Sequence, residues 1–319
     1  MKLSLLLPTY NRVDKIRELI GYLKREKVFS NDNIEVIISN NASTDQTRLY
    51  LEGVKESNLQ IYHQNENLGL AGNIRFLTGI ANGEYIWIMG DNDYFVSGAI
   101  DKIMATIDDG VNVAHVFLNY GYVDGNGNML QIGVYKGVGK YYSNGFEMLF
   151  DVVGNVNMGA MMFISSNVYR KDIIDKVNSF VLEQNEKDNL ALPLGYALYS
   201  CEGEGMCISD VYVYNESDTS STWSDREILV YNRDMIAIFD KVSHLFQNYK
   251  ELREFHVNHF QSDFPEYKYM LYGRKFKRDN YAMKLLLRYY PLRVIKDALV
   301  VPGRFIKYRL AKHKNDDGT

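Results

Sequence analysis

Short apolar segments alternate with helix-forming segments through the first ninety residues of this 319-residue chain. The apolar segments predict strands that are buried on both faces. They are Leu3–Leu7, Glu35–Ser39, Leu59–Tyr62 and Glu84–Met89. Strands that alternate with helices predict an α/β fold, in which a mostly parallel sheet is flanked by helices. Ligands bind such a sheet where its strands end.

The pattern changes after residue 100. The later segments that predict strands are 113–118, 158–164 and 205–214. From Asp225 onward the chain has helical spacing almost to its end, broken by prolines. We therefore expect a domain over residues 1–224, with a first half at 1–100 and a second half at 101–224. A helical C-terminal extension is expected over residues 225–319.

The composition is that of an ordinary soluble globular protein, with 46% apolar and 24% charged residues. No apolar stretch approaches the roughly 20 residues of a membrane-spanning helix. Two cysteines, Cys201 and Cys207, are few for so long a chain and are typical of a reducing compartment. These features predict a cytoplasmic protein.

Four polar clusters follow the four predicted strands. They are Pro8–Arg12, Ser39–Asp45, Asn65–Asn73 and Gly90–Asp93. Because the carboxyl ends of parallel strands meet at one edge of a sheet, we expect all four clusters to lie together. A protein stabilised only by packing has no need for polar residues gathered there.

The fourth cluster, Asp91-Asn92-Asp93, carries two carboxylates one residue apart. Mg²⁺ and Mn²⁺ prefer such oxygen ligands and keep positions open for water and phosphate. A bare Asp-x-Asp tripeptide is more often a solvated turn. Its position directly after a buried strand favours a metal site formed by Asp93 and Asp91, in which the cation bridges a diphosphate.

These segments together resemble glycosyltransferase family 2, which has the GT-A fold, a Rossmann-like sheet flanked by helices. The matching segments are Pro8–Arg12, Asn40–Asp45, Asn67-x-Gly69-x-x-x-Asn73 and Gly83–Asp93. Their order and spacing agree with the family over roughly the first hundred residues. Within the family, the chain is most similar to bacterial transferases that build surface polysaccharides, including those like abequosyltransferases.

The resemblance implies that residues 1–100 bind a nucleotide-sugar and that residues 101–224 bind the acceptor. Pro8, Tyr10 and Asn40 would border the nucleotide base, Asp91 the ribose or the metal, and Asp93 would be the principal metal ligand. The other residues assigned to the donor are Thr9, Asn11, Arg12, Asn67, Gly69, Asn73 and Asn92. Asn40 replaces the family's usual aspartate, and an asparagine both accepts and donates hydrogen bonds. A UDP- or dTDP-sugar is favoured, although the base stays open.

An inverting transfer needs a general base that deprotonates the acceptor hydroxyl, usually a carboxylate. The Glu-Asp pair that the family places at the start of a helix in its second half is absent. The nearest segment begins Glu186-Lys187-Asp188. Asp188 and then Glu186 are the candidates. Alternatively, both acids belong to a charged helix start, where they favour the helix dipole.

The sequence therefore predicts an inverting, metal-dependent glycosyltransferase that uses Mn²⁺ or Mg²⁺. An alternative is a catalytically silent protein of the same fold that binds a nucleotide or a sugar. A nucleotidyltransferase is a third hypothesis, but the Gly-rich, Arg/Lys-containing loop expected after the first strand is absent.

The C-terminal segment is strongly basic. Residues 271–314 contain thirteen Lys or Arg against two acids, although the whole chain has a net charge of −4. Apolar and cationic residues interleave from 285 to 314, which is typical of a segment that lies on an anionic bilayer. The alternative is a terminal helix packed on the protein with a solvated basic face. We expect a peripheral position at the inner face of the cell membrane, a glycan or lipid-linked glycan acceptor, and no nucleic acid partner, since no such binding motif is found.

Overall fold

The computed structural model describes residues 1–108, 112–123, 129–132, 139–153, 159–180, 189–216 and 230–242, together with Leu287 and Leu292. The chain divides into two compact units, Met1–Ser221 and Thr222–Thr319. In the second unit the described elements are a π-helical turn, η3 (Val230–Asp234), and α10 (Met235–Val242).

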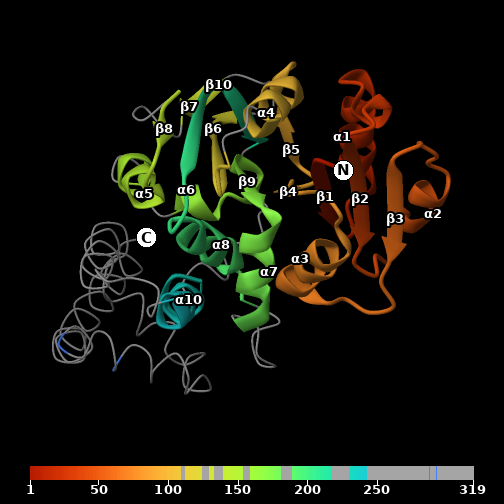
Figure 1. The fold of residues 1–319 in the computed structure, drawn as a ribbon. Helices are drawn as coiled ribbons and strands as arrows, with labels where there is room; N and C mark the ends of the chain where they lie inside the picture. The colour runs from red at the N-terminus through yellow and green to blue at the C-terminus, as the bar shows by residue number, and fades with distance from the viewer. Residues whose placement is uncertain are drawn as a thin grey trace, which may run out of the picture. The chain divides into compact units, whose positions relative to one another are not determined.

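A ten-stranded sheet forms the centre of the first unit, with the strand order β3-β2-β1-β4-β9-β6-β10-β5 (Figure 1). The other two of the ten strands lie off this path, where β7 pairs with β6 and β8 pairs with β10. The strands are β1 (Leu3–Thr9), β2 (Ile34–Asn40), β3 (Leu59–His63), β4 (Tyr85–Ile88), β5 (Asp93–Phe95), β6 (His115–Val123), β7 (Met129–Ile132), β8 (Tyr141–Tyr142), β9 (Asn167–Arg170) and β10 (Gly205–Glu216).

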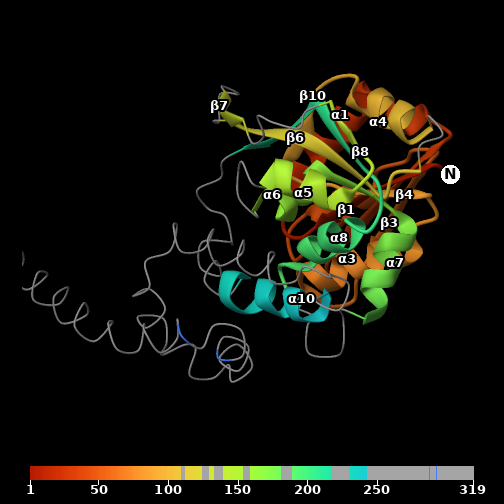
Figure 2. The same cartoon turned by 60° about the vertical axis from the view of Figure 1, so that its left-hand side comes forward.

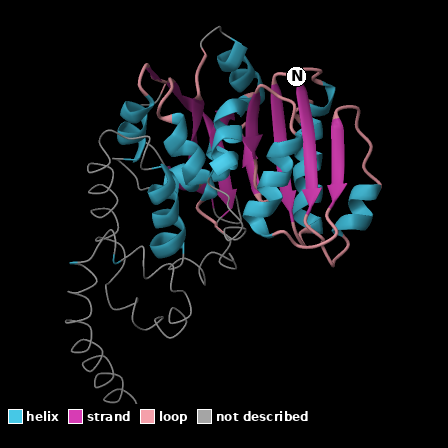
Figure 3. Cartoon of the chain, turned by 60° about the horizontal axis from the view of Figure 1, so that its bottom comes forward, coloured by secondary structure: helices cyan, strands magenta, loops and turns pink. Residues whose placement is uncertain are grey.

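The first four strands are mutually parallel, which confirms the predicted α/β class. Their arrows run side by side in Figure 3. In β1 Leu5 lies between Val36 of β2 and Trp87 of β4, and all three side chains are fully buried. The second half of the sheet is mixed, because β9 runs antiparallel to both β4 and β6. The polar ends of β1 to β4 therefore meet at one edge, as the sequence predicts.

Helices cover both faces of this sheet. The helices of the first unit are α1 (Val13–Arg25), α2 (Thr47–Glu52), α3 (Gly69–Ile80), α4 (Ala99–Asp108), α5 (Gly145–Val153), α6 (Gly159–Met162), α7 (Lys171–Phe180) and α8 (Leu192–Ser200), with short 3₁₀ turns η1 (Val28–Ser30) and η2 (Ile164–Ser166). Helices α1 and α4 lie on one face, and α3, α7 and α8 lie on the other (Figure 2). In α1 the buried residues Ile16, Leu19, Ile20 and Leu23 recur at helical spacing, which directs one apolar face to the sheet.

The strand predicted over residues 158–164 is wrong for its described part. Gly159–Met162 forms helix α6, Ile164–Ser166 forms η2, and the strand follows as β9. A short apolar run does not distinguish a buried strand from a buried helical turn. The strand is set instead by antiparallel pairing of Val168 with Trp87 on one side and Val116 on the other.

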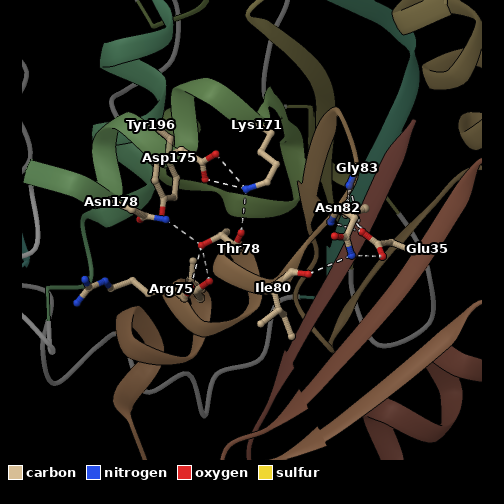
Figure 4. A network of polar contacts seen from close by, with 12 residues as sticks. Glu35, Arg75, Thr78, Ile80, Asn82, Gly83, Lys171, Asp175, Asn178 and Tyr196 are labelled. Atoms are coloured by element: carbon tan, nitrogen blue, oxygen red, sulfur yellow. Dashed lines mark hydrogen bonds and ion pairs between the residues drawn. The ribbon is translucent and has the colours of Figure 1, made fainter. Parts of the chain in front are cut away.

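Two polar networks stabilise the sheet and its helices away from the polar strand ends (Figure 4). At the opposite edge, the buried Glu35 carboxylate accepts hydrogen bonds from Ser4 Oγ at 2.5 Å, Asn82 N at 2.6 Å and Gly83 N at 3.1 Å. Glu35 therefore stabilises the fold at the edge opposite the polar ends of β1 to β4.

The second network joins three helices. Asn178 of α7 donates to Thr78 Oγ1 of α3 at 2.9 Å and accepts from Tyr196 of α8 at 2.8 Å.

In the part of the chain that the structure describes, every helix is too short or too polar to span a membrane.

Candidate active site

A continuous set of hydrogen bonds joins the four polar segments at the ends of β1 to β4. Thr9 Oγ1 donates to Asp91 Oδ2 at 2.8 Å, which links the first segment to the fourth. Thr44 N donates to Asn11 Oδ1 at 2.7 Å, which links the second segment to the first. Asn41 Nδ2 donates to Asn67 Oδ1 at 2.9 Å and so links the second segment to the third. The structure thus brings together the segments that the sequence places at four strand ends.

Asp91 is a buried carboxylate with two partners from the first segment. Besides the Thr9 hydroxyl, the Arg12 guanidinium lies 3.5 Å from Asp91 Oδ1. Burial raises the pKa of Asp91, and the nearby Arg12 charge and Thr9 hydrogen bond oppose this shift only in part. Arg12 and Thr9 therefore orient Asp91 and offset part of the cost of burying its charge.

Asp93 is also buried, at 5% exposure, and it begins strand β5 rather than a loop. Ser165 Oγ donates to Asp93 Oδ2 at 2.5 Å and accepts a hydrogen bond from Gly90 N at 2.9 Å. Ser165 belongs to η2, 72 residues further along the chain. Sequence reasoning missed this residue, because no motif in the segment around it indicates a contact with Asp93.

Tyr122 of β6 is a second residue that sequence reasoning missed. Its pKa is raised by burial and then by the negative charge of Asp93. Asn92 lies between the two aspartates and is half-buried. Ser165 of η2 therefore contacts Asp93 directly, and Tyr122 of β6 is influenced by its charge.

The first segment combines a fixed backbone with an exposed ring. Asn11 has φ 52°, in the left-handed region, and its backbone N donates to Ser43 Oγ at 2.8 Å. Tyr10 beside it is 42% exposed, whereas Pro8 is half-buried within β1. An exposed aromatic ring on a fixed turn provides a flat surface for a ligand.

Asn40, the last residue of β2, is buried, with only 1% of the residue exposed. Its Oδ1 accepts from Ser43 N at 3.1 Å, and its Nδ2 lies 3.1 Å from His63 Nδ1. The pKa of His63 is lowered by burial and then by the positive charge of Arg48, so the ring is neutral at pH 7 and its Nδ1 is able to accept. The Asn40 oxygen therefore holds the loop that follows β2, and its amide nitrogen contacts the end of β3.

The amides of the third polar segment, Asn65–Asn73, also fix the backbone around them. Asn67 Oδ1 accepts from Gly69 N as well as from Asn41, and Gly69 has φ 71°, which an L side chain rarely adopts. Asn73, buried at 2%, exchanges hydrogen bonds with Ser39: Ser39 Oγ donates to Asn73 Oδ1, and Asn73 Nδ2 donates to Ser39 O. These amides set the shape of the site edge.

The candidate general bases, Asp188 and Glu186, lie outside the described residues. The structure describes the chain again from Asn189, whose Oδ1 accepts from Ala191 N at 2.8 Å just before α8 begins at Leu192.

Asp91 and Asp93 provide oxygen ligands of the kind that Mg²⁺ and Mn²⁺ prefer. Within the described part of the chain, no group of three or more His, Cys, Asp or Glu side chains is arranged to hold a metal ion. Two carboxylates at a strand end fit an open site, in which phosphate oxygens and water supply the other ligands. The residues present therefore fit a divalent cation that binds together with a diphosphate.

A family model described as glycosyl transferase family 2 matches residues 4–170, from β1 through β9. The matched region is more than half of the chain and contains all four polar segments. The chain belongs to glycosyl transferase family 2. The family resemblance drawn from the sequence is thereby confirmed, and both Asp91 and Asp93 lie inside the family region.

Two curated relatives are bacterial proteins whose names describe sugar transferases. Abequosyltransferase RfbV of Salmonella typhimurium is 30% identical over 116 residues, which cover 35% of this chain and 34% of that protein. A GalNAc(5)-diNAcBac-PP-undecaprenol beta-1,3-glucosyltransferase of Campylobacter jejuni is 28% identical over 142 residues, 44% of each chain. The chain thus spans less than half of the length of these two relatives.

Solved structures confirm the GT-A fold. The Staphylococcus aureus TarS fragment 1–349 in complex with UDP-GlcNAc superposes with a TM-score of 0.61 at 16% identity, covering 91% of this chain and 80% of that one. The mannosyltransferase PcManGT of Pyrobaculum calidifontis, in complex with GDP-Man and Mn²⁺, gives 0.50 at 15% identity, covering 76% and 64%. Identities this low show the fold alone.

Proposed function

We propose that this family 2 protein transfers a sugar from a nucleoside-diphosphate donor, a UDP- or dTDP-sugar, to a glycan acceptor, with inversion at the anomeric carbon. One observation carries the proposal: two buried carboxylates, Asp91 and Asp93, follow β4 and are held by the side chains of Thr9, Arg12 and Ser165. Burying two charges side by side is costly unless a ligand uses them.

The donor half of the site divides into a base region and a diphosphate region. The exposed ring of Tyr10, the adjacent Pro8 and the loop that Asn40 holds are assigned to the nucleotide base. Asp93, with Asp91, is assigned to a divalent cation, which when bound offsets the negative charge that builds on the departing nucleoside diphosphate. Arg12 beside Asp91 adds a fixed positive charge from the chain itself.

The acceptor half is assigned to residues 101–224. In an inverting transfer the acceptor oxygen forms a bond to the anomeric carbon as the bond from that carbon to the diphosphate breaks. Asp188 or Glu186 accepts the proton of the acceptor hydroxyl. Asp188→Asn and Glu186→Gln variants that both turn over at the wild-type rate would remove this assignment.

The acceptor is proposed to be a bacterial surface glycan under construction, linked to a lipid. The relative from Campylobacter jejuni carries an undecaprenol-linked acceptor in its name. The basic segment 285–314 would hold the enzyme at the anionic inner face of the membrane, and its two described leucines, Leu287 and Leu292, are 47% and 82% exposed. Co-sedimentation with anionic but not neutral vesicles, lost on removal of residues 285–319, is the expected result.

A panel of UDP-, dTDP- and GDP-sugars with Mn²⁺ tests the donor reaction by release of nucleoside diphosphate. Asp93→Asn should lower turnover at least about 100-fold, because a positioned metal contributes several kcal/mol to the transition state. Asp101→Asn, at an exposed site on α4, is the matched control and should behave as wild type. Nucleotide-sugar binding without release would favour a silent binding protein. In a separate reaction with a nucleoside triphosphate and a sugar 1-phosphate, release of pyrophosphate would favour a nucleotidyltransferase. Proton NMR of the product linkage decides inversion.

A further inference from the structure

We propose that Ser165 is a positioning residue for Asp93, and that its hydroxyl increases the affinity of the donor site for a divalent cation. The inference rests on the proposed function, since it assigns Asp93 to that cation. Ser165 would not touch the cation or the donor itself. It would act through the carboxylate that does.

The hydroxyl of Ser165 has a defined direction. Its oxygen accepts the Gly90 N–H at 2.9 Å, and its single proton is donated to Asp93 Oδ2 at 2.5 Å. A serine hydroxyl has one donor and two acceptor positions, so it can accept the Gly90 N–H and still donate its proton to Asp93. Ser165 thereby connects both sides of the turn that carries Asp91-Asn92-Asp93.

The backbone of Ser165 is held as firmly as its side chain. Trp87 Nε1 donates to the Ser165 carbonyl at 2.8 Å, and both residues are completely buried. Trp87 belongs to β4, the strand that leads into the Asp91-Asn92-Asp93 turn. Ser165 is therefore fixed to the strand that leads into the turn whose carboxylate it orients.

Gly90 confines Asp93 from a second direction. A Cβ atom at Gly90 would lie 2.6 Å from Asp93 Oδ2, so the carboxylate occupies the space that any other residue would fill. Asp93 is thus held between Gly90 and the Ser165 hydroxyl. A carboxylate with a set orientation loses little further freedom when a cation binds it, and loss of such supporting contacts typically weakens metal binding 10- to 100-fold.

The test is Mn²⁺ binding in the presence of UDP, measured by electron paramagnetic resonance of free Mn²⁺ on the full chain. Ser165→Ala should weaken Mn²⁺ binding about 10- to 100-fold. Ser166→Ala is the matched control: Ser166 is the next residue of η2, equally buried, and its Oγ has no hydrogen-bond partner among the residues that the structure describes. Its Mn²⁺ affinity should equal that of the wild type.

A structural role alone predicts a different result. If Ser165 only stabilised the fold, Ser165→Ala would lower the melting temperature but leave the Mn²⁺ affinity of the folded protein unchanged, and the proposal would be overturned. In steady-state assays the Mn²⁺ concentration for half-maximal rate should rise, while the rate at saturating Mn²⁺ should largely recover. Should Ser165→Ala fail to fold, Ser165→Cys, which keeps the side-chain size but donates weakly, takes its place.

Asp93→Asn separates failure of this inference from failure of the proposed function. If the wild type binds no Mn²⁺, or if Asp93→Asn binds it as well as the wild type does, the assigned cation site itself is wrong. If Asp93→Asn loses binding while the Ser165 variants match Ser166→Ala, the site stands and only the positioning role of Ser165 is overturned.

Discussion

Substituting Gly90 by alanine should strongly slow the proposed sugar transfer without removing either carboxylate of the site. The new Cβ would lie 2.6 Å from Asp93 Oδ2, whereas an ordinary contact begins near 3.4 Å. The atom that must give way is the end of a side chain, so the fold can accommodate the change. The Asp93 carboxylate must move by about 0.8 Å, and its hydrogen bond from Ser165 must lengthen or break.

The size of the effect follows from this displacement. A misplacement of about 1 Å in a catalytic constellation costs on the order of 100-fold in rate, or about 2.7 kcal/mol in the activation free energy. The free energy of unfolding should fall much less, by about 1 kcal/mol, because one charge-assisted hydrogen bond is weakened and no cavity forms. Activity and stability are therefore expected to separate.

The assay is nucleoside diphosphate release at fixed Mn²⁺ and donor, together with urea unfolding of the same preparations. Gly79→Ala is the matched control, because a Cβ there meets no atom of the described part of the chain within 4 Å and alanine is favoured within helix α3. It should retain full activity and unfold at equal or higher urea. Turnover of Gly90→Ala within twofold of wild type would refute the reasoning that Asp93 must stay in place.

Two further predictions concern stability. Glu35→Ala should lower the free energy of unfolding by about 3 kcal/mol, because alanine leaves the Asn82 N–H and the Ser4 hydroxyl without their acceptor. Glu35→Gln should lower it by only about 1 kcal/mol. Equal urea midpoints for the two variants would contradict this expectation. Burial lowers the pKa of His115 from 6.5 to about 4, so the unfolded chain binds a proton below pH 6.5 that the folded chain excludes. Stability should therefore fall by about 2 kcal/mol from pH 7 to pH 5. His115→Phe should lose this portion of the pH dependence, and identical slopes for both proteins in urea titrations would argue against it.

Much of the edge where β1 to β4 end was predictable, because it follows from local sequence patterns. Buried strands reveal themselves as apolar runs, and parallel strands must end at a common edge, so Thr9 and Asp91 were expected to meet although 82 residues separate them. Asn40 and Asn73 were also expected at this edge. The structure shows in addition that their amides hold the loops together.

The error at residues 158–164 has a different origin. An apolar run of that length suits either a strand or a helical turn, and only pairing partners decide between them. The antiparallel strand β9 contains just two apolar residues, Val168 and Tyr169, so its sequence alone predicts little. Its place between β4 and β6 is a property of the assembled sheet.

The sequence by itself determined the family, the parallel half of the sheet and the two carboxylates at the end of β4. Only the tertiary structure decided how Asp93 is held, because its hydrogen-bond partner Ser165 comes from an element that no spacing rule connects to β4. Local periodicity records which way a side chain points within its own element. A hydrogen bond between segments 72 residues apart depends on how those elements pack, and that information is distributed over the whole sheet.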